Sequence, residues 1–178
     1  GSTGVREFHF TGGEPLLRRD LFKLMDRAEE AGLSPSLFTN LVALDGEALK
    51  NIVDRGVPVF TSMDGPSREV HEAIRGPGTW SRLVEGVKAL AREEVYVHVN
   101  IAVAEPNWSH VGDTVRRAVE LGASSVSLIP AMPVGRALEM GTYAKPALFA
   151  QALIDAADAA RELGIVLSVW CAPFAPLV

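Results

Sequence analysis

The sequence contains a single cysteine, Cys171, among its 178 residues. A lone cysteine cannot build an internal disulfide framework. The chain also lacks an N-terminal basic stretch followed by an apolar one, which a secretory signal would show. Both absences lead us to expect a cytoplasmic protein.

Positive charge and long apolar runs are scarce as well. The formal net charge is −5, whereas proteins that bind nucleic acids usually gather Lys and Arg on one face. The apolar run Val95–Ala104 is interrupted by His98 and Asn100, and it is shorter than the ~20 residues of a membrane-spanning helix. We therefore expect neither a nucleic-acid partner nor a membrane one.

What the sequence does contain is typical of one compact α/β domain over residues 1–178. Hydrophobic residues make up 48% of the chain, which suffices for a sizeable core. Short β-branched or aromatic runs alternate with longer segments of helical period, as in repeated βα units around a parallel sheet. The expected strands cover residues 5–11, 35–40, 57–63, 94–103, 124–130 and 165–171.

Apolar residues at helical spacing lie between these strands. The expected stripes are Leu21, Leu24, Met25 and Ala28; Leu83, Val87 and Leu90; Val115, Val119 and Leu121; and Leu148, Leu153 and Ala157. Gly32, Gly56, Gly122 and Gly164 each follow a helical pattern and precede a strand, as a glycine at a helix C-terminus does.

The strands alternate in polarity. In Val95–Ala102 the odd positions are apolar, whereas the even ones include His98 and Asn100. The apolar set must face the covering helices, so the other set lines a concave lumen. A closed eight-stranded barrel has an apolar interior and about 250 residues. We therefore expect a partial (β/α)6 TIM-like barrel with a parallel sheet and a polar concave lumen; the alternative is a doubly wound open sheet.

The loop after the first expected strand has the sequence Thr11-Gly12-Gly13-Glu14-Pro15. Loops that follow parallel strands converge on one edge, where they form a shared site. Two glycines let the backbone approach a ligand, and a rim carboxylate beside them suits an ammonium group. A surface turn that starts a helix is the alternative for the same residues.

Further segments follow in a characteristic order: Thr39-Asn40, then TSMDGP at 61–66, His71, and Arg75-Gly76. Together with GGEP this series resembles the radical S-adenosylmethionine superfamily over nearly the whole chain. The resemblance implies that Gly12, Gly13 and Glu14 receive the amino group of S-adenosylmethionine. It also places Asn40 in the cofactor site, beside Leu41 where the family often has glycine.

The resemblance assigns Ser62 and Arg75 to the cofactor carboxylate, which a hydroxyl and a guanidinium suit chemically. Asp64 is interpreted as a turn or helix cap, because DGPS is typical of a helix start. His71, on the helix that follows, is expected to make local hydrogen bonds. His9 and His110 are expected to be structural.

Asn100 resembles the family position that meets the ribose or the methionine moiety. His98, one inward step back, either lines the substrate cavity or is a buried histidine with its hydrogen bonds satisfied. The segment IPAMPVGRA at 129–137 resembles a PxGRA segment of members that modify peptides, tetrapyrroles or sulfatases. This resemblance makes Ile129, Pro130 and Met132 candidates for the adenine pocket, and Arg136 either binds substrate or closes an ion pair.

One departure from the family is large. Its defining CxxxCxxC loop, whose thiolates hold a [4Fe–4S] cluster, is missing. We expect the first strand and this loop to lie upstream of Gly4, so that strand 5–11 is an edge open to self-association. Cys171 is either a ligand of an auxiliary cluster in a SPASM or twitch-type C-terminal domain, or a small buried residue.

By this resemblance, the parent protein is an oxidoreductase or maturase. It would cleave S-adenosylmethionine with an electron from an external donor and abstract hydrogen from a peptide, tetrapyrrole or other small substrate. The chain as given is expected to be inactive without cluster ligands. The alternatives are a cluster-less binding or scaffold domain and an ordinary βα-barrel hydrolase or lyase.

Overall fold

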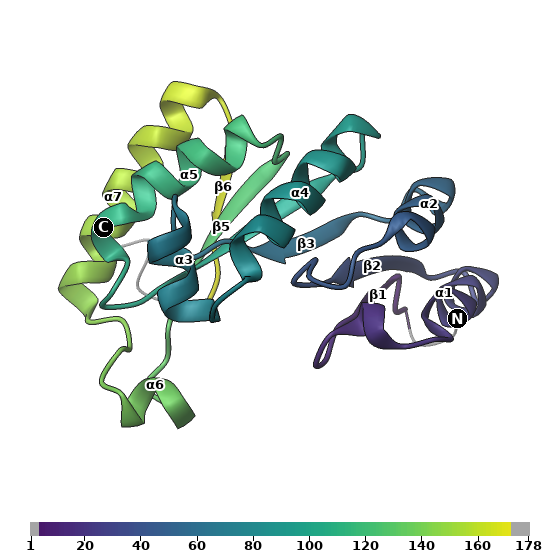
Figure 1. The fold of residues 1–178 in the computed structure, drawn as a ribbon, viewed down its shortest axis with the longest axis horizontal. Coiled ribbons are helices and arrows are strands. Elements are labelled where there is room, and N and C mark those ends of the chain that lie inside the picture. The colour runs from purple at the N-terminus through teal and green to yellow at the C-terminus, as the bar shows by residue number, and fades with distance from the viewer. Residues whose placement is uncertain (1–3, 172–178) are drawn as a thin grey trace.

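The computed structural model describes residues 4–171, which contain one six-stranded parallel sheet (Figure 1). Its strands are β1 (Glu7–Phe10), β2 (Ser34–Phe38), β3 (Val59–Ser62), β4 (Val97–Val103), β5 (Ser125–Pro130) and β6 (Val166–Val169). Their order in the sheet is their order in the chain, and each neighbouring pair is parallel. Each of the six expected strands is thereby confirmed.

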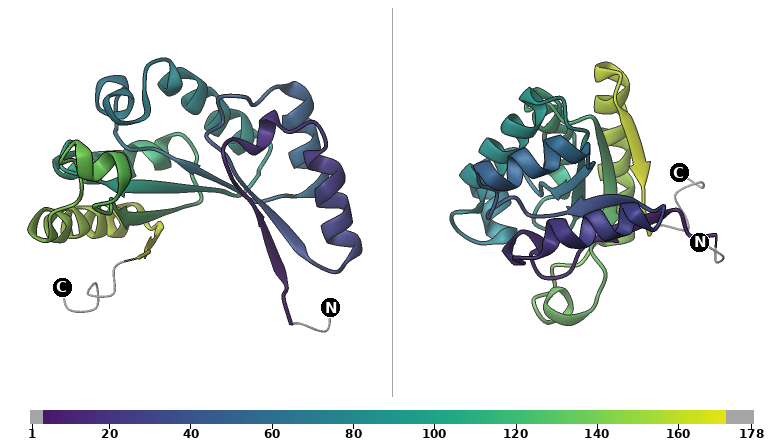
Figure 2. Two further views of the ribbon diagram at one scale, coloured as in Figure 1. Left: turned by 90° about the horizontal axis from the view of Figure 1, so that it is seen from below. Right: turned by 90° about the vertical axis from the view of Figure 1, so that its right-hand side faces the viewer.

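The helices follow the strands in the same sequence. They are η1 (Pro15–Leu17), α1 (Leu21–Glu30), α2 (Gly46–Arg55), α3 (Arg68–Arg75), α4 (Thr79–Arg92), η2 (Trp108–His110), α5 (Val111–Glu120), α6 (Gly135–Glu139) and α7 (Pro146–Leu163). Figure 2 shows the main helices along the convex side of a curved sheet whose other side is open. A doubly wound sheet would carry helices on both faces, so that alternative is wrong. No helix within residues 4–171 is long and apolar enough to cross a membrane.

Local sequence signals account for the ends of these elements. The Asp45 side chain caps α2 by accepting a hydrogen bond from the Ala48 backbone N–H. At the other end of α2, Gly56 adopts a left-handed backbone with φ of 62°, and Gly164 does the same after α7 with φ of 66°. These conformations favour glycine, which confirms the helix ends expected there.

The core lies between the sheet and the helices. Val97, Val99, Ile101 and Val103 of β4 are fully buried in it, as their alternation predicts. The even positions of β4 face the other side of the sheet, and His98 and Asn100 are paired in register with Phe60 and Ser62 of β3. The polar concave lumen is therefore confirmed in β4.

The stripe expected in α7 has the wrong phase. Leu148, Leu153 and Ala157 are only partly buried, and the face that enters the core consists of Phe149, Ala152, Ala156, Ala159 and Ala160. Small side chains let α7 pack closely against α5, where a Cβ on Gly112 would lie 3.2 Å from the Asp155 carbonyl oxygen. The expected stripe therefore lies beside the buried face, and Leu153 packs against the core from its edge.

Candidate cofactor site

Polar groups from β1 and β2 meet where the two strands end. The Gly12-Gly13-Glu14 segment follows β1, and Thr39 and Asn40 follow β2. Gly12 has φ of 139°, a region that L side chains rarely adopt, whereas Gly13 has no such requirement. Glycine is therefore needed at position 12 for the backbone turn that precedes Glu14.

The carboxylate of Glu14 is held by three hydrogen bonds. Its Oε1 accepts from the Thr39 hydroxyl at 2.6 Å and from the Leu16 backbone N–H at 3.1 Å. Its Oε2 accepts from the Asn40 backbone N–H at 2.8 Å. A carboxylate has about four lone-pair sites, so one remains for a ligand. The free acceptor site of this fixed carboxylate thus fits an ammonium group, such as the one that S-adenosylmethionine carries.

The turn after β2 keeps a glycine-like backbone without glycine. Leu41 has φ of 62° and is 1% exposed. Its N–H donates to the Thr39 hydroxyl at 3.1 Å, and the Asn40 side chain accepts from the Val42 N–H at 2.9 Å. The departure from the family pattern at position 41 therefore changes the residue but not the left-handed turn.

A second polar group lies on the concave face of β3, β4 and β5. Asn100 is paired in register with Ser62 on one side and Ser127 on the other. Its Oδ1 accepts from the Ser127 hydroxyl at 2.7 Å, and its Nδ2 donates to the Thr61 carbonyl at 3.3 Å. The amide of Asn100 is thus fixed, and the Ser62 side chain stands beside it, half-buried.

Asp64 is not a helix cap, so the interpretation from the sequence is wrong. Ser67 is the N-cap residue of α3, whereas the fully buried Asp64 carboxylate forms an ion pair with Arg75 and accepts from the Ala102 N–H at 2.8 Å. The chain continues beside β4 after β3, with the Met63 N–H donating to the Asn100 carbonyl at 3.0 Å, and this brings the Asp64 carboxylate against Ala102. Only the Nε of Arg75 is engaged in this hydrogen bond, and its side chain is 39% exposed. A guanidinium carries four further N–H donors on its other two nitrogens, which suit a ligand carboxylate.

Buried polar groups hold this corner together. Nδ2 of Asn107 donates to the carbonyls of Asp64 and Ala102, at 2.9 Å each, and its Oδ1 accepts from Ala104 N–H at 2.7 Å. Nδ1 of His71 accepts from Asp64 N–H at 3.2 Å, the kind of local hydrogen bond that the sequence predicts. Burial lowers the pKa of His71, partly offset by the negative charge of Asp64.

His98 is buried in the lumen at 4% exposure, but it is only half satisfied. Its Nδ1 lies 2.6 Å from the Ser125 hydroxyl, whereas its Nε2 has no hydrogen-bond partner among the described residues. The ring stacks on Trp170, with centroids 5.3 Å apart and planes 7° apart. Burial lowers the pKa of His98, partly offset by the neighbouring Asn100 side chain. The two expectations for His98, a cavity residue and a buried structural histidine, both stay predictions.

An aromatic row continues from His98 across the concave face. Phe60 lies 5.1 Å from the His98 ring, Phe38 stacks on Phe60 at 4.5 Å, and His9 lies 5.4 Å from Phe38. The Nδ1 of His9 is hydrogen-bonded to Ser36 at 2.6 Å. Ser62 and Asn100 lie one alternating position further toward the carboxyl ends of their strands than Phe60 and His98. The aromatic row thus forms a floor below the polar groups.

The residues expected around an adenine differ in exposure. Ile129 is half-buried opposite Ala102, Pro130 is buried, and Met132 is 53% exposed. A mainly apolar cavity of about 440 Å³ lies nearby at the ends of β4 and β5. Its lining residues are Ala73, Ile74, Ala102, Ala104, Pro106, Ala131, Ala137, Met140 and Thr142, without Ile129 or Met132. Arg136 belongs to α6.

The described residues do not fit an iron–sulfur cluster. They contain one cysteine, Cys171, and no group of three His, Cys, Asp or Glu side chains within 4–171 is placed to hold a metal ion. The Cys171 thiol is free and exposed, so the alternative of a small buried residue is wrong. No step through a cluster is derived from these residues.

Three contributors to the site were missed or misread from the sequence. Thr39 was noted only as part of a strand end, although its hydroxyl holds Glu14. Asn107 gave no signal, because an asparagine in a loop has no periodicity to read. Trp170 follows the last strand, and its stacking on His98 depends on which strands are neighbours in the folded sheet.

The fold and the site define a class of domain: a partial parallel α/β barrel with a polar ligand site at the carboxyl ends of its strands. A model of the Radical SAM superfamily matches residues 1–118. The chain belongs to this superfamily. Its members bind S-adenosylmethionine and a [4Fe–4S] cluster.

Curated relatives match most of this chain, whereas this chain matches less than half of each relative. An AdoMet-dependent heme synthase of Oleidesulfovibrio alaskensis is 30% identical over 167 residues, which are 92% of this chain and 43% of that protein. The same enzyme of Methanosarcina barkeri is 32% identical, over 92% and 47%. A PqqA peptide cyclase of Streptomyces rochei is 33% identical, over 70% and 35%. The chain spans about half, or less, of the length of these relatives.

Solved structures share the fold. A domain of pyruvate-formate lyase-activating enzyme from Bacteroides vulgatus has a TM-score of 0.71 at 13% identity, covering 92% of this chain and 98% of that one. Native anSMEcpe with bound AdoMet and the Cp18Cys peptide has a TM-score of 0.75 at 23% identity, covering 93% and 50%. Identities this low support the architecture and no more.

Proposed function

We propose that this chain binds S-adenosylmethionine at the carboxyl edge of its sheet, with Glu14 receiving the methionine ammonium group. The observation that carries the proposal is the Glu14 carboxylate, fixed by donors from Thr39, Asn40 and Leu16 with one lone-pair site left over. A charge-assisted hydrogen bond to a pre-organised carboxylate is stronger than a neutral one. Gly12 and Gly13 leave the space that the ligand needs.

The carboxylate of the methionine moiety of S-adenosylmethionine is assigned to Ser62 and Arg75. Arg75 is oriented by the buried Asp64 carboxylate, so its free N–H groups are held for a second carboxylate. Asn100, fixed by Ser127, is assigned to the ribose or the methionine moiety. Asn40 supports the ammonium end through its backbone N–H.

The remaining assignments concern the adenine and the substrate. Ile129 and Met132 are proposed for the adenine, beside the apolar cavity at the ends of β4 and β5. His98 and Arg136 are proposed for the substrate. The support for His98 is its place in the aromatic row of the lumen, beside Trp170, with an Nε2 that has no partner among the described residues, since buried polar atoms without partners are costly. A substrate hydrogen bond would remove that cost.

The natural protein is proposed to be a radical S-adenosylmethionine enzyme. When bound, S-adenosylmethionine supplies a 5′-deoxyadenosyl radical after reductive cleavage to methionine, and this radical abstracts hydrogen from the substrate. Thiolates outside residues 1–178 would hold the cluster, and an external donor would supply the electron. The 178 residues alone would therefore be inactive.

The substrate class is proposed from the relatives, whose names include a heme synthase and a peptide cyclase. A peptide or a tetrapyrrole is the favoured substrate. The same relatives support a subgroup with SPASM or twitch-type auxiliary-cluster domains, in which the exposed Cys171 would be a cluster ligand. The edge of β1 that does not face β2 is a proposed surface for pairing with a further strand.

The test uses the natural protein that contains this chain, reconstituted with iron and sulfide and reduced under anaerobic conditions. We expect 5′-deoxyadenosine to form, and Glu14→Gln to abolish most of it while weakening S-adenosylmethionine binding. Glu47→Gln, which removes an exposed carboxylate from α2, is the matched control and should change neither.

Two outcomes would count against the proposal. If Glu14→Gln binds S-adenosylmethionine with the affinity of the wild type, Glu14 does not bind the ammonium group. Binding without any 5′-deoxyadenosine, by a natural protein that holds no cluster, would favour the second candidate function, a non-catalytic binding domain. That candidate rests on the lack of cluster ligands among the described residues.

A further inference from the structure

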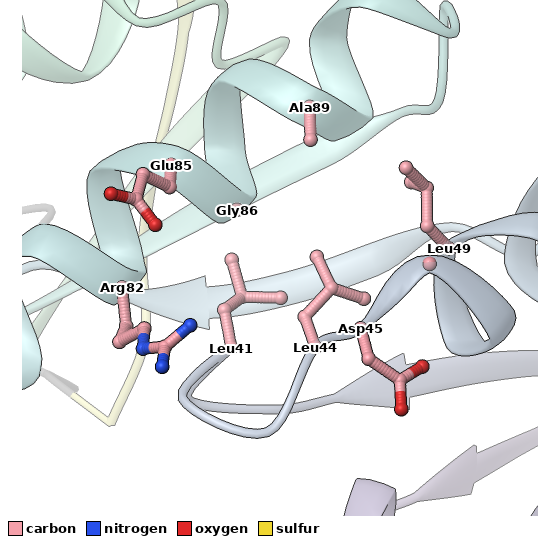
Figure 3. A pocket seen from close by; sticks show the side chains of 9 residues that line it. Leu41, Leu44, Asp45, Leu49, Arg82, Glu85, Gly86 and Ala89 are labelled. Carbon is pink, nitrogen blue, oxygen red and sulfur yellow. The ribbon is translucent and has the colours of Figure 1, made fainter.

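Gly86 lies on α4, on the convex side of the sheet. It faces the turn that contains Thr39 and Asn40, which donate hydrogen bonds to Glu14. Figure 3 shows the side chains of Leu41 and Leu44 pointing from that turn toward α4, where Gly86 presents no side chain. A Cβ on Gly86 would lie 3.0 Å from the Leu41 Cβ and 3.2 Å from its Cδ1. A side chain at position 86 would therefore crowd Leu41.

Leu41 has little freedom to move away. It is 1% exposed, and its backbone is left-handed with φ of 62°. Its N–H donates to the Thr39 hydroxyl at 3.1 Å, and its carbonyl accepts from the Leu44 N–H at 3.2 Å. A side chain at position 86 would have to displace this turn as a unit.

The same turn holds Glu14 through two of its three hydrogen bonds. The Thr39 hydroxyl that accepts from Leu41 donates to Glu14 Oε1 at 2.6 Å. The Asn40 N–H, in the Thr39–Asn40 peptide, donates to Oε2 at 2.8 Å, and Asn40 directly precedes Leu41. A shift of a few tenths of an ångström at Leu41 is thus passed to both oxygens of the carboxylate.

We propose that Gly86 is a positioning residue, which holds the Glu14 carboxylate in its binding geometry through Leu41 and the Thr39–Asn40 segment. The inference rests on the proposed function of Glu14 as the ammonium ligand. Gly86 touches no ligand itself. It acts by leaving room for a buried leucine whose backbone needs a left-handed turn.

The experiment compares two buried helix glycines in the natural protein that contains this chain. Gly86→Ala is expected to weaken S-adenosylmethionine binding about tenfold, equivalent to about 1.4 kcal/mol, measured as Kd by calorimetry. Gly112→Ala in α5 is the matched control, because its Cβ would lie 3.2 Å from a backbone oxygen of α7. It should leave Kd unchanged, whatever its effect on the thermal unfolding midpoint.

A second readout follows the turn directly and needs no activity. Hydrogen exchange of the segment that contains the Asn40 amide should become faster in Gly86→Ala than in the wild type, because the hydrogen bond to Glu14 is strained. Gly112→Ala should leave exchange in this segment as it is in the wild type. Unchanged exchange and unchanged Kd in Gly86→Ala would overturn the inference.

Rescue separates positioning from general damage. Leu41→Gly removes the two closest atoms that a Cβ at position 86 would meet, leaving Leu44 Cδ2 at an ordinary contact distance of 3.4 Å. Glycine also adopts the left-handed backbone without strain. In the Leu41→Gly background, Gly86→Ala should change Kd by no more than about twofold. An equal loss of affinity in both backgrounds would contradict the relay through Leu41.

Separate results would contradict the proposed function of Glu14 and the positioning role of Gly86. If Glu14→Gln binds S-adenosylmethionine like the wild type, the ammonium site itself is wrong. If Glu14→Gln weakens binding and Gly86→Ala does not, only the positioning role of Gly86 is wrong.

Discussion

The hydroxyl of Thr39 donates a 2.6 Å hydrogen bond to Oε1 of Glu14, and this contact joins two strand ends that are 25 residues apart in the chain. The same oxygen atom of Thr39 accepts from the Leu41 N–H. One buried threonine therefore connects the carboxylate of the candidate site to the turn beside it.

Replacing Thr39 with valine keeps the shape of the side chain and removes both hydrogen bonds. We expect the free energy of unfolding to fall by about 2 kcal/mol, because one of the bonds involves a charged acceptor. Binding of S-adenosylmethionine should weaken as the carboxylate loses its fixed orientation. Denaturant unfolding and calorimetry measure the two effects.

Thr114→Val is the control for that substitution. Thr114 is equally buried, but its hydroxyl donates to the His110 carbonyl within the η2–α5 segment at 2.7 Å. We expect a loss of about 1 kcal/mol and an unchanged Kd. Equal affinities in the two variants would show that Thr39 does not orient Glu14.

Leu41 should reverse the usual order of alanine and glycine. Both substitutions lose a buried side chain, but only glycine relieves the left-handed backbone, worth about 1 kcal/mol. We therefore expect Leu41→Gly to be less destabilised than Leu41→Ala. Leu83, buried in regular α4, is the control, where glycine should be worse than alanine by about 1 kcal/mol. The same order at both positions would contradict a strained Leu41.

Replacing either member of the Asp64–Arg75 ion pair should lower the free energy of unfolding, by a different amount for each residue. Asp64 is fully buried and also accepts from Ala102 N–H, so Asp64→Asn is expected to cost about 2 kcal/mol. Arg75→Gln should cost more, about 3 kcal/mol, because it leaves the fully buried Asp64 carboxylate without its cation. Denaturant unfolding of both variants and of the double variant measures their coupling.

Asp26→Asn provides the surface comparison for that pair. Asp26 binds Arg55 at 2.8 Å with about half of its side chain exposed, and such pairs contribute about 1 kcal/mol or less. A cost for Asp64→Asn no larger than that for Asp26→Asn would contradict the buried role of Asp64.

Stability should fall as the pH drops below about 6.5, the ordinary pKa of histidine. Burial lowers the folded-state pKa of both His98 and His71. The unfolded chain then takes up protons first, so the free energy of unfolding decreases with falling pH. By about pH 8, well above the ordinary histidine pKa of about 6.5, both histidines are almost entirely neutral in either state, so these two groups add almost no slope beyond that pH.

The window from pH 6.5 to 5 isolates these histidines. Asp20, Asp26 and Glu69 also have lowered pKa values in the folded protein, through hydrogen bonds to Arg18, Arg55 and Ser67, but their contributions are lost only at more acidic pH. Denaturant unfolding at several pH values should show a smaller slope in His98→Gln. A flat profile between pH 7 and 5 in the wild type would contradict the prediction.

How much of this site was visible in the sequence depends on the distance over which its residues interact. Glu14 was recognised because the glycine pair and the proline beside it form a continuous motif. Its hydrogen bond to Thr39 was not visible, because which strand end meets which depends on the order of the strands in the sheet. Asp64 was misread for the same reason: DGPS suits a helix cap locally, but β4 packs against it in the folded chain.

The sequence by itself determined the six βα repeats, the side of β4 that enters the core, and the family motifs, because periodicity, helix-ending glycines and short motifs are local properties. Only the tertiary structure decided the buried face of α7, the partners of Glu14 and Asp64, and the stacking of His98 on Trp170. These depend on contacts between residues far apart in the chain, where close packing selects among arrangements that are equivalent locally.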